Sequence, residues 1–380
     1  MKVAVVHEWL DTYAGSDRAA AEILAIWPQA DLFTLVDFLP QEDRGFLAGR
    51  RINTSFLQHM PFSRRHFRKY VPLMPRAVES FDLSGYDMVV SSSHAFAKGV
   101  RTRPDQYHLC YCYTPMRYAW AMEGEYLQDF GLARSPLAWL ARRELARFRE
   151  WDRAAADRVT DIIAISQFIA GRIKAAYDRD APVIYPPVDV EAFALREGKD
   201  DFYVVVARLV PYKRVDVVVE AFRRMPDREL VVIGGGPQFA TMVRDKPANV
   251  HLLGYAPQRA VIEHLQHARA FVFAAEEDFG IAPVEALACG TPVIALGKGG
   301  SLETVTGGDD PGVLRTGVFF AEATPAAIVE AVRQFDALSP AISAQVCRDR
   351  AMEFSSARFR RELGGYAQLR YRAFQDARAA

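Results

Sequence analysis

The stretch Phe271–Val293, FVFAAEEDFGIAPVEALACGTPV, decides the fold class. Its apolar start predicts a buried strand, an acidic loop follows, and Pro283 suits the first turn of a helix. A buried strand that leads through a short loop into a helix is typical of parallel α/β sheets. Glu277 is expected on the loop and Glu285 in the first turn of the helix, at the sheet edge where such folds bind ligands. An acidic helix start that only complements the helix dipole is the alternative interpretation.

The same alternation of short apolar runs and helical segments continues along all 380 residues. It predicts two doubly wound α/β units, with a boundary at the stiff Pro186-Pro187. We expect an N-terminal domain of residues 1–187, joined by a helix over 356–380, and a C-terminal domain of residues 188–355. The expected strands are Val3–Val6, Asp31–Leu35, Asp87–Ser91, His108–Tyr113, Asp161–Ile165, Phe202–Ala207, Glu229–Gly234, Val250–Leu253, Ala270–Ala274, Pro292–Leu296 and Gly317–Phe320.

Composition excludes several classes of protein. The 47 Lys+Arg residues balance 47 Asp+Glu residues, which argues against general nucleic-acid binding. With 50% hydrophobic residues the chain is not expected to be disordered. The four cysteines show neither a zinc spacing nor a disulfide framework, and a reducing, cytoplasmic compartment is expected. No apolar run is long enough to span a membrane.

Two further loops are predicted at the edge that carries the acidic loop. Arg208 ends a strand and Lys213 is expected to open the next helix, a pairing of cations suited to a diphosphate. Gly234-Gly235-Gly236-Pro237 follows the next strand and lets backbone approach a ligand. It is not a dinucleotide fingerprint, so a hydride-transfer enzyme is disfavoured. Solvated cations and a plain loop are the alternatives.

The N-terminal half offers two weaker candidates. Gly15 precedes Ser16 at a helix start, where backbone could meet a phosphate. His94 follows the strand that ends in Ser91-Ser92-Ser93, and a histidine at such an edge can act near neutral pH. A histidine that is simply hydrogen-bonded in a loop is the alternative.

Together these motifs resemble a known enzyme family. The series comprises Ala207-Arg208-Leu209, Lys213, Gly234–Pro237, Glu277, Gly280, Glu285-Ala286, Gly290–Val293, Gly299-Gly300 and Glu303, with Ser91–Val100 and Tyr113–Tyr118 in the first half. In order and spacing it resembles the retaining nucleotide-sugar glycosyltransferases of family 4, and within them a mannosyltransferase-like subgroup of bacterial surface polysaccharide synthesis. The resemblance implies the GT-B fold, in which two Rossmann-like domains face a central cleft. It departs from the family at Ala14-Gly15-Ser16-Asp17 and at Ala207.

The resemblance also implies roles for single residues. Arg208 and Lys213 would hold the donor diphosphate and stabilise the leaving group. Glu277 and His94 would face the transferred sugar, and Glu285 would bind the donor ribose. The remaining donor contacts would come from Gly15, Gly235, Gly236, Phe279, Gly280, Ile281 and Ala282.

The implied reaction moves a hexose with retention, by front-face displacement, since no carboxylate nucleophile is evident. Mannose from GDP-mannose is the expected donor, a UDP-sugar donor is the first alternative, and a catalytically silent scaffold is the alternative from another class. No cofactor or metal is expected, and Asp309-Asp310 is interpreted as a solvated loop pair.

The acceptor is expected to be a saccharide linked to a polyprenyl diphosphate. The segment His59–Arg76, HMPFSRRHFRKYVPLMPR, interleaves five Lys/Arg residues with apolar ones and suits an anionic inner-leaflet surface. Peripheral attachment to the cytoplasmic face of the membrane follows from that interpretation. A mixed surface with one buried apolar side is the alternative.

Overall fold

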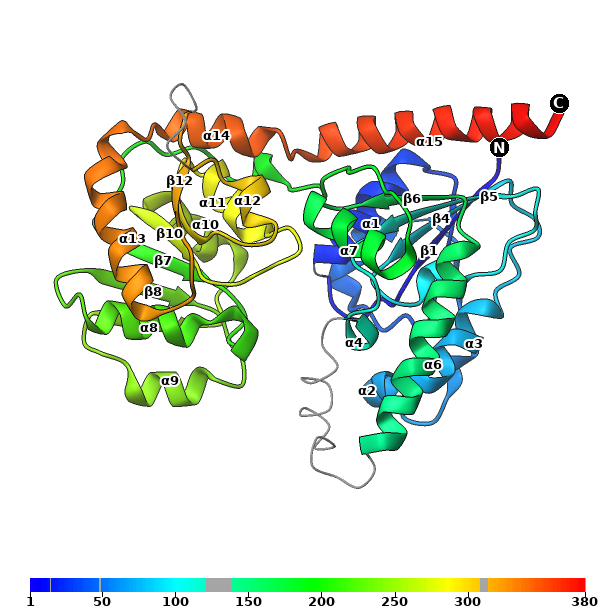
Figure 1. Ribbon diagram of the computed structural model, residues 1–380, viewed down its shortest axis with the longest axis horizontal. Coiled ribbons are helices and arrows are strands. Elements are labelled where there is room, and N and C mark those ends of the chain that lie inside the picture. Colours follow the sequence, from blue (N-terminus) through cyan, green and yellow to red (C-terminus); the bar gives the residue numbers. More distant parts are fainter. Residues whose placement is uncertain (14, 48, 121–137, 308–313, 380) are drawn as a thin grey trace. The chain divides into compact units, whose positions relative to one another are not determined.

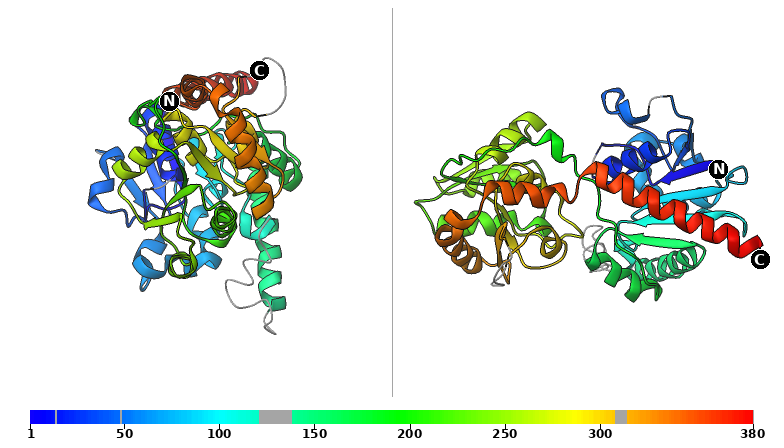
Figure 2. Two further views of the ribbon diagram at one scale, coloured as in Figure 1. Left: turned by 90° about the vertical axis from the view of Figure 1, so that its left-hand side faces the viewer. Right: turned by 90° about the horizontal axis from the view of Figure 1, so that it is seen from above.

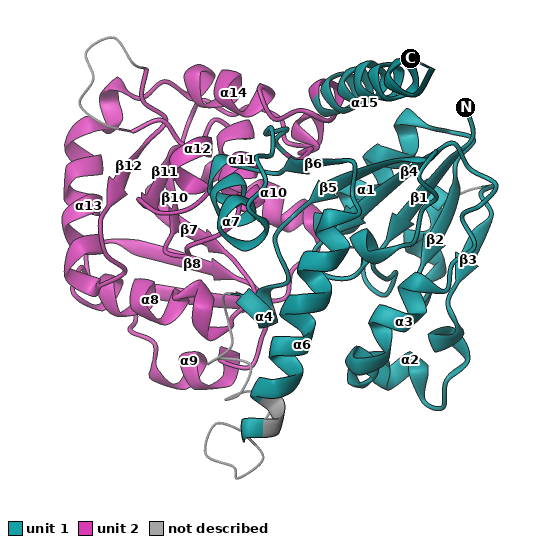
Figure 3. Ribbon diagram, turned by 45° about the vertical axis from the view of Figure 1, so that its right-hand side comes forward, with its two compact units in different colours: residues 1–185, 359–380 teal, residues 186–358 magenta. Residues whose placement is uncertain are grey.

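The computed structural model describes residues 1–13, 15–47, 49–120, 138–307 and 314–379. The chain divides into two compact units, coloured separately in Figure 3. Unit 1 comprises Met1–Tyr185 and Phe359–Ala380, and unit 2 comprises Pro186–Arg358. These boundaries lie within three residues of the expected ones, and the last helix is grouped with the N-terminal unit.

Unit 1 is built on a six-stranded parallel sheet with the order β3-β2-β1-β4-β5-β6. The strands β1, β4 and β5 are buried along their whole length, as expected where helices cover a sheet on both faces. The strands are β1 (Val3–His7), β2 (Asp31–Thr34), β3 (Ile52–Thr54), β4 (Met88–Ser93), β5 (Tyr107–Cys112) and β6 (Asp161–Ala164). The helices are α1 (Gly15–Ile26), α2 (Ser63–His66), α3 (Met74–Glu79), α4 (Arg117–Trp120), α6 (Ala138–Asp157), α7 (Gln167–Tyr177) and α15 (Ser356–Ala379).

Unit 2 repeats this plan with the order β12-β11-β10-β7-β8-β9, again all parallel (Figure 1). Its strands are β7 (Phe202–Val206), β8 (Glu229–Ile233), β9 (Val250–Gly254), β10 (Ala270–Phe273), β11 (Val293–Leu296) and β12 (Gly317–Phe320). Its helices are α8 (Val215–Arg223), α9 (Phe239–Asp245), α10 (Gln258–His267), α11 (Ile281–Ala288), α12 (Ser301–Thr304), α13 (Pro325–Leu338) and α14 (Ala344–Met352).

Each sheet has a position where the strand order reverses direction. In unit 1 this topological switch point lies between β1 and β4, and in unit 2 between β7 and β10. Ligands of open α/β sheets bind beyond the carboxyl ends of the strands at such a point. The sheet order therefore indicates where to look for a site in each unit.

The long helix α15, red in Figure 2, belongs to unit 1 from Phe359 onward (Figure 3). The Phe359 ring packs on Tyr111 of β5, and Phe374 packs on Tyr107 of the same strand. Arg370 makes a two-pronged ion pair with Asp161 at the start of β6. The C-terminal helix thus covers β5 and β6.

The sequence predicted most of these elements, with three corrections. Every expected strand is present, but β3 was missed because a three-residue edge strand is too short to show an alternating pattern. Lys213 does not open α8: it ends a short 3-10 turn, and Arg214 follows in the left-handed conformation. α11 begins at Ile281, so Glu285 lies in its second turn rather than its first.

The helix α6 is described from Ala138 onward, and residues 121–137 before it lie outside the described ranges. Leu145, Phe148 and Ala155 of α6 are buried, so this helix packs apolar side chains into the core of unit 1. None of the helices in the described ranges is long and apolar enough to cross a bilayer.

Candidate active site

The best candidate site lies at the switch point of unit 2. The loop after β7 carries Arg208 and leads into the 3-10 turn Pro211–Lys213, and the loop after β10 carries Glu277. Because β7 and β10 are adjacent and parallel, both loops emerge at the same edge of the sheet. Lys213 and Glu277, 64 residues apart in sequence, therefore meet there.

Lys213 and Glu277 form an ion pair across this edge. Their side chains are 17% and 19% exposed, so the pair is shielded but reachable from solvent. The ammonium has three donors, so it can bind a further anion while one donor stays on the carboxylate. The pair shows that a cation and a hydroxyl-accepting carboxylate share one location.

Arg208 lies near the start of the same loop and is exposed. It makes no ion pair with any carboxylate in the part of the chain that the structure describes. Arg208 therefore retains its donors for a ligand.

The glycines of the loop after β8 have two different explanations. Gly234 and Gly236 both adopt positive φ, and a Cβ atom would stand 1.8 Å from the Ala207 carbonyl oxygen and 2.4 Å from that of Leu209, respectively. Both are required by close backbone packing between the loops after β7 and β8. A Cβ on Gly235 would meet no atom within 4 Å. Of these three glycines, only Gly235 is not required by packing, and the space beside its Cα is open to a ligand.

The loop before α11 is held by contacts with the backbone at Gly300. The Gly300 amide donates to the Glu277 carbonyl at 2.8 Å, and a Cβ on Gly300 would collide with the Phe279 backbone. The Phe279 side chain is buried against Phe354, so only its backbone is available to a ligand. This bracing holds the Glu277 backbone in place.

The start of α11 supplies backbone donors. Gly280 precedes the helix with φ +86° and has no side chain to cap it. Ile281 and Ala282 are partly buried in the first turn, and Glu285 is partly buried one turn later. Uncapped amides at a helix N-terminus favour an anionic ligand. Because α11 begins at Ile281, Glu285 lies one turn farther from these amides than the sequence suggested.

The switch point of unit 1 holds the other two predicted residues. His94 directly follows β4, is partly buried, and packs its ring edge-on against Trp9 at 4.8 Å. Burial lowers the pKa of the His94 imidazole, against the opposing effect of the Glu8 carboxylate. Gly15 is the first residue of α1, and the neighbouring Ser16 carbonyl accepts the Tyr113 hydroxyl at 3.1 Å.

Sequence reasoning missed three buried charges near His94. They are Glu8, Lys98 and Asp152, all fully buried. A signal was available for two of them: Glu8 directly follows the apolar run Val3–Val6, and Lys98 interrupts an apolar segment. A charge in such a position is costly unless it has partners, so it calls for a specific explanation.

The segment His59–Arg76 divides by side-chain type. Its cations Arg64, Arg65, Arg68, Lys69 and Arg76 are all exposed. Phe67 and Met74 lie in the core of unit 1, and Met60, Tyr70, Val71 and Leu73 pack against that core. Phe62 is the exception at 79% exposure. The buried apolar side chains agree with the alternative of a mixed surface with one buried apolar side, whereas the exposed cations fit either interpretation.

Within the described ranges, no cluster of three or more His, Cys, Asp or Glu side chains could hold a metal ion. Asp309-Asp310 lies outside those ranges.

Comparison with known proteins addresses both fold and family. Residues 189–351, nearly all of unit 2, match the family model described as glycosyl transferases group 1. Among solved structures, Anabaena Alr3699/HepE in complex with UDP and glucose superposes with a TM-score of 0.68, covering 97% of this chain and 99% of that one at 15% identity. The chain has the GT-B fold. The two GT-B units expected from the sequence are thus confirmed as six-stranded Rossmann-like sheets.

Curated relatives match over shorter stretches of this GT-B chain. A GDP-mannose-dependent alpha-(1-6)-phosphatidylinositol monomannoside mannosyltransferase of Mycolicibacterium smegmatis is 34% identical over 175 residues, which is 38% of this chain and 46% of the relative. A GDP-mannose-dependent monoacylated alpha-(1-6)-phosphatidylinositol monomannoside mannosyltransferase of Corynebacterium glutamicum is 33% identical over 37% of this chain and 45% of its own length. The chain thus matches less than half the length of each of these relatives.

Proposed function

We propose that the chain is a retaining glycosyltransferase that moves a hexose from a nucleotide sugar to a saccharide acceptor. The observation that carries this proposal is the meeting of Lys213 and Glu277 at the switch point of unit 2, with Arg208 and the α11 amides nearby. Cations and uncapped amides suit a diphosphate, and a carboxylate beside them suits sugar hydroxyls. The match of residues 189–351 to the glycosyl transferase family model supports it.

In the proposed reaction the bond between the anomeric carbon and the donor phosphate oxygen breaks. The acceptor hydroxyl attacks from the same face, forms the new glycosidic bond, and passes its proton to the leaving phosphate oxygen. Arg208 and Lys213 stabilise the negative charge that develops on the diphosphate. Glu277 and His94 hold the transferred sugar, and Glu285 binds the ribose. No metal is required, because the two cations neutralise the diphosphate.

We propose GDP-mannose as the donor, since both curated relatives above carry that donor in their names. A UDP-sugar is the second candidate, favoured by the UDP and glucose bound to the Anabaena protein. The test is a thermal-shift screen with GDP, UDP, ADP and their sugars. Stabilisation by GDP and GDP-mannose is expected, and stabilisation by UDP alone selects the second candidate. No stabilisation by any nucleotide overturns both and favours a silent scaffold.

The proposed acceptor is a polyprenyl-diphosphate-linked saccharide at the cytoplasmic face of the inner membrane. The exposed cations of residues 59–76 and the protruding Phe62 support contact with an anionic surface. Sedimentation with phosphatidylglycerol vesicles tests this contact. The triple variant Arg64→Glu, Arg65→Glu, Lys69→Glu is expected to lose binding, whereas Arg244→Glu, an exposed cation of unit 2, is expected to keep it. Equal sedimentation of all three proteins refutes contact through the cations of residues 59–76, and failure of the wild type to sediment refutes membrane contact altogether.

A further inference from the structure

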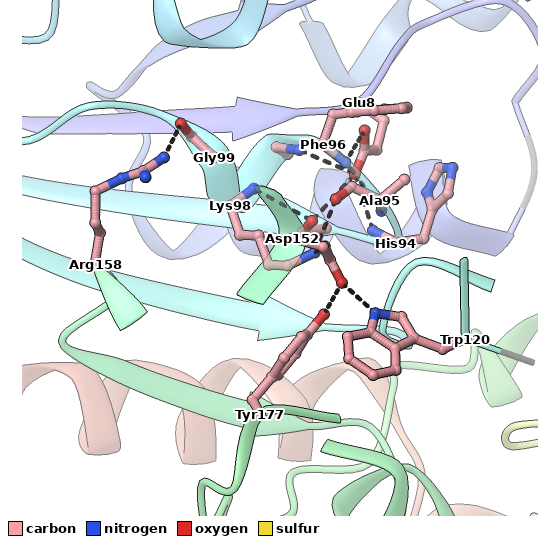
Figure 4. A network of polar contacts seen from close by, with 12 residues as sticks. Glu8, His94, Ala95, Phe96, Lys98, Gly99, Trp120, Asp152, Arg158 and Tyr177 are labelled. Atoms are coloured by element: carbon pink, nitrogen blue, oxygen red, sulfur yellow. Dashed lines mark hydrogen bonds and ion pairs between the residues drawn. The ribbon is translucent and has the colours of Figure 1, made fainter. Parts of the chain in front are cut away.

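The carboxylate of Glu8 occupies a nest of backbone donors in unit 1 (Figure 4). Oε1 accepts the amides of His94, Ala95, Phe96 and Ala97 at 3.0, 2.7, 2.8 and 3.1 Å. The Ser93 hydroxyl donates to the same oxygen at 3.1 Å, and Oε2 accepts the Phe96 amide at 3.0 Å. Glu8 is fully buried, so these donors replace the water it has lost.

The nest is a turn whose amides all point at one spot. Consecutive amides aimed inward form an anion-binding concavity. Here the anion is a side chain of the protein itself, delivered by the residue after β1. Burial alone would raise the pKa of the Glu8 carboxyl, but His94 and the amides of residues 95–97 hold it below its ordinary value. The carboxylate is therefore charged at neutral pH and bound to every residue of the turn.

The far end of the turn is held by a second buried charge. The Lys98 ammonium donates to the Ala95 carbonyl at 2.8 Å and pairs with Asp152 of α6 at 2.5 Å. The other Asp152 oxygen accepts Trp120 Nε1 at 2.8 Å and the Tyr177 hydroxyl at 2.6 Å. The turn after β4 is thus clamped by a carboxylate at one end and an ammonium at the other, as Figure 4 shows.

We propose that Glu8 is a positioning residue, which fixes the turn of residues 93–97 and so sets the place and charge of the His94 imidazole. This inference rests on the proposed function, in which His94 faces the transferred sugar. Glu8 itself is fully buried and acts only through the turn.

The charge of Glu8 acts on His94 alongside other groups of unit 1. Asp17 of α1 also favours the protonated imidazole, whereas His7 of β1 and Arg117 of α4 disfavour it. Burial disfavours it most, and Glu8 is the strongest opposing group. Removing the Glu8 charge therefore lowers the pKa of His94 further.

The first test is Glu8→Gln, which keeps the size of the side chain and removes its charge. We expect the pKa of the His94 imidazole, followed by NMR titration of histidine-labelled protein, to fall relative to wild type. His94→Gln assigns the resonance. An unchanged His94 pKa in a folded Glu8→Gln protein overturns the proposal. This readout needs no donor or acceptor, so it decides the proposal even if the thermal-shift screen refutes a transferase.

Turnover gives the second readout. Because misplacing a reacting group by about 1 Å costs about 10²-fold in rate, kcat of Glu8→Gln is expected to fall about 10²-fold. The KM for donor is expected to change much less than kcat, since Arg208 and Lys213, the proposed diphosphate contacts, lie in unit 2. A general loss of folded protein would lower the apparent kcat without moving the His94 pKa.

Asp161→Asn is the matched control. Asp161 is another well-bonded carboxylate of unit 1, held by Tyr107 and Arg370 at the start of β6, on the opposite sheet edge. This variant is expected to lose stability and to leave the His94 pKa, kcat and the KM for donor unchanged. An equal pKa change in Asp161→Asn would make the Glu8 effect a non-specific one and overturn the assignment.

Glu8→Asp covers the case in which Glu8→Gln fails to fold. It keeps the charge but is one methylene shorter, so the carboxylate cannot reach all five donors. We expect reduced kcat with a His94 pKa close to that of wild type. Wild-type kcat in Glu8→Asp overturns the proposal.

Discussion

The two switch points share one strand order but are built in opposite ways. In unit 1 the edge beyond β1 and β4 is filled by the protein's own charged side chains, Glu8, Lys98 and Asp152, which are fully buried. Glu8 accepts backbone amides of the turn after β4, and Lys98 pairs with Asp152. In unit 2 the edge beyond β7 and β10 keeps Lys213 and Glu277 partly exposed and Arg208 exposed. A closed edge fixes a backbone turn, whereas an open edge leaves charge available to a ligand.

The largest effect is expected from breaking the closed edge. Lys98→Met leaves the Asp152 carboxylate buried without its cation, which typically costs about 3–5 kcal/mol. Urea unfolding followed by circular dichroism measures the loss. Lys174→Met, which removes an exposed pair with Asp178 in the same unit, is expected to change stability by less than about 1 kcal/mol. Equal losses in both variants would contradict the contrast between a closed edge and an exposed surface.

The open edge is expected to respond in activity rather than in stability. Lys213→Ala removes a donor aimed at the developing charge on the diphosphate, and kcat is expected to fall about 10²–10³-fold. The partly exposed Glu277 can be solvated, so the melting temperature should change little. Donor consumption and a thermal melt measure the two quantities. Wild-type turnover in a folded Lys213→Ala protein removes Lys213 from the proposed site.

A pair of glycine variants separates packing from ligand access. Gly234→Ala places a methyl group against the Ala207 carbonyl at positive φ, which is expected to cost about 1–3 kcal/mol in unfolding free energy. Gly235→Ala meets no atom and is expected to keep the stability within about 0.5 kcal/mol. Denaturant unfolding compares them. If Gly235→Ala weakens nucleotide binding while Gly234→Ala mainly destabilises, the open space at Gly235 serves the donor; the reverse pattern contradicts that assignment.

The smallest effect concerns a lysine of unit 2 that lacks a carboxylate partner among the described residues. Lys199 donates to the carbonyls of Gln266 and Cys289 and to the Thr291 hydroxyl, and burial lowers its pKa from 10.5 to about 8. The unfolded chain therefore binds more protons between these values, so this group adds stability as pH rises through that window. The difference in unfolding free energy between wild type and Lys199→Met should increase from pH 8 to pH 10. A flat difference contradicts the lowered pKa.

Buried strands were predictable because an apolar β-branched run between polar turns has few alternatives. The strand VAVVH and the run FVFAA are such cases. Helix starts were less predictable, since the first turn of α11 is set by Gly280 at positive φ, which no periodic pattern reveals. The 3-10 turn at Lys213 was missed for the same reason.

For the site, the sequence predicted which loops carry charge but not which charges meet. Glu277 and Lys213 pair because β7 and β10 are neighbours, a fact of sheet order rather than of spacing. Glu8 and Asp152 escaped notice because their partners are backbone amides and side chains from distant elements. The identity of a residue does not reveal such hydrogen bonds between elements that are distant in sequence.

The helix α15 has a consequence for how the protein is made. Unit 1 needs residues 359–379 to cover Tyr107 and Tyr111 of β5, yet a ribosome delivers them only after all of unit 2. During synthesis the aromatic flank of β5 and β6 therefore stays uncovered, while unit 2 has its whole sheet available earlier. Unit 1 is therefore completed after unit 2, although its sheet is synthesised first. Nascent chains stalled before residue 359 are expected to bind chaperones through the uncovered flank of β5 and β6.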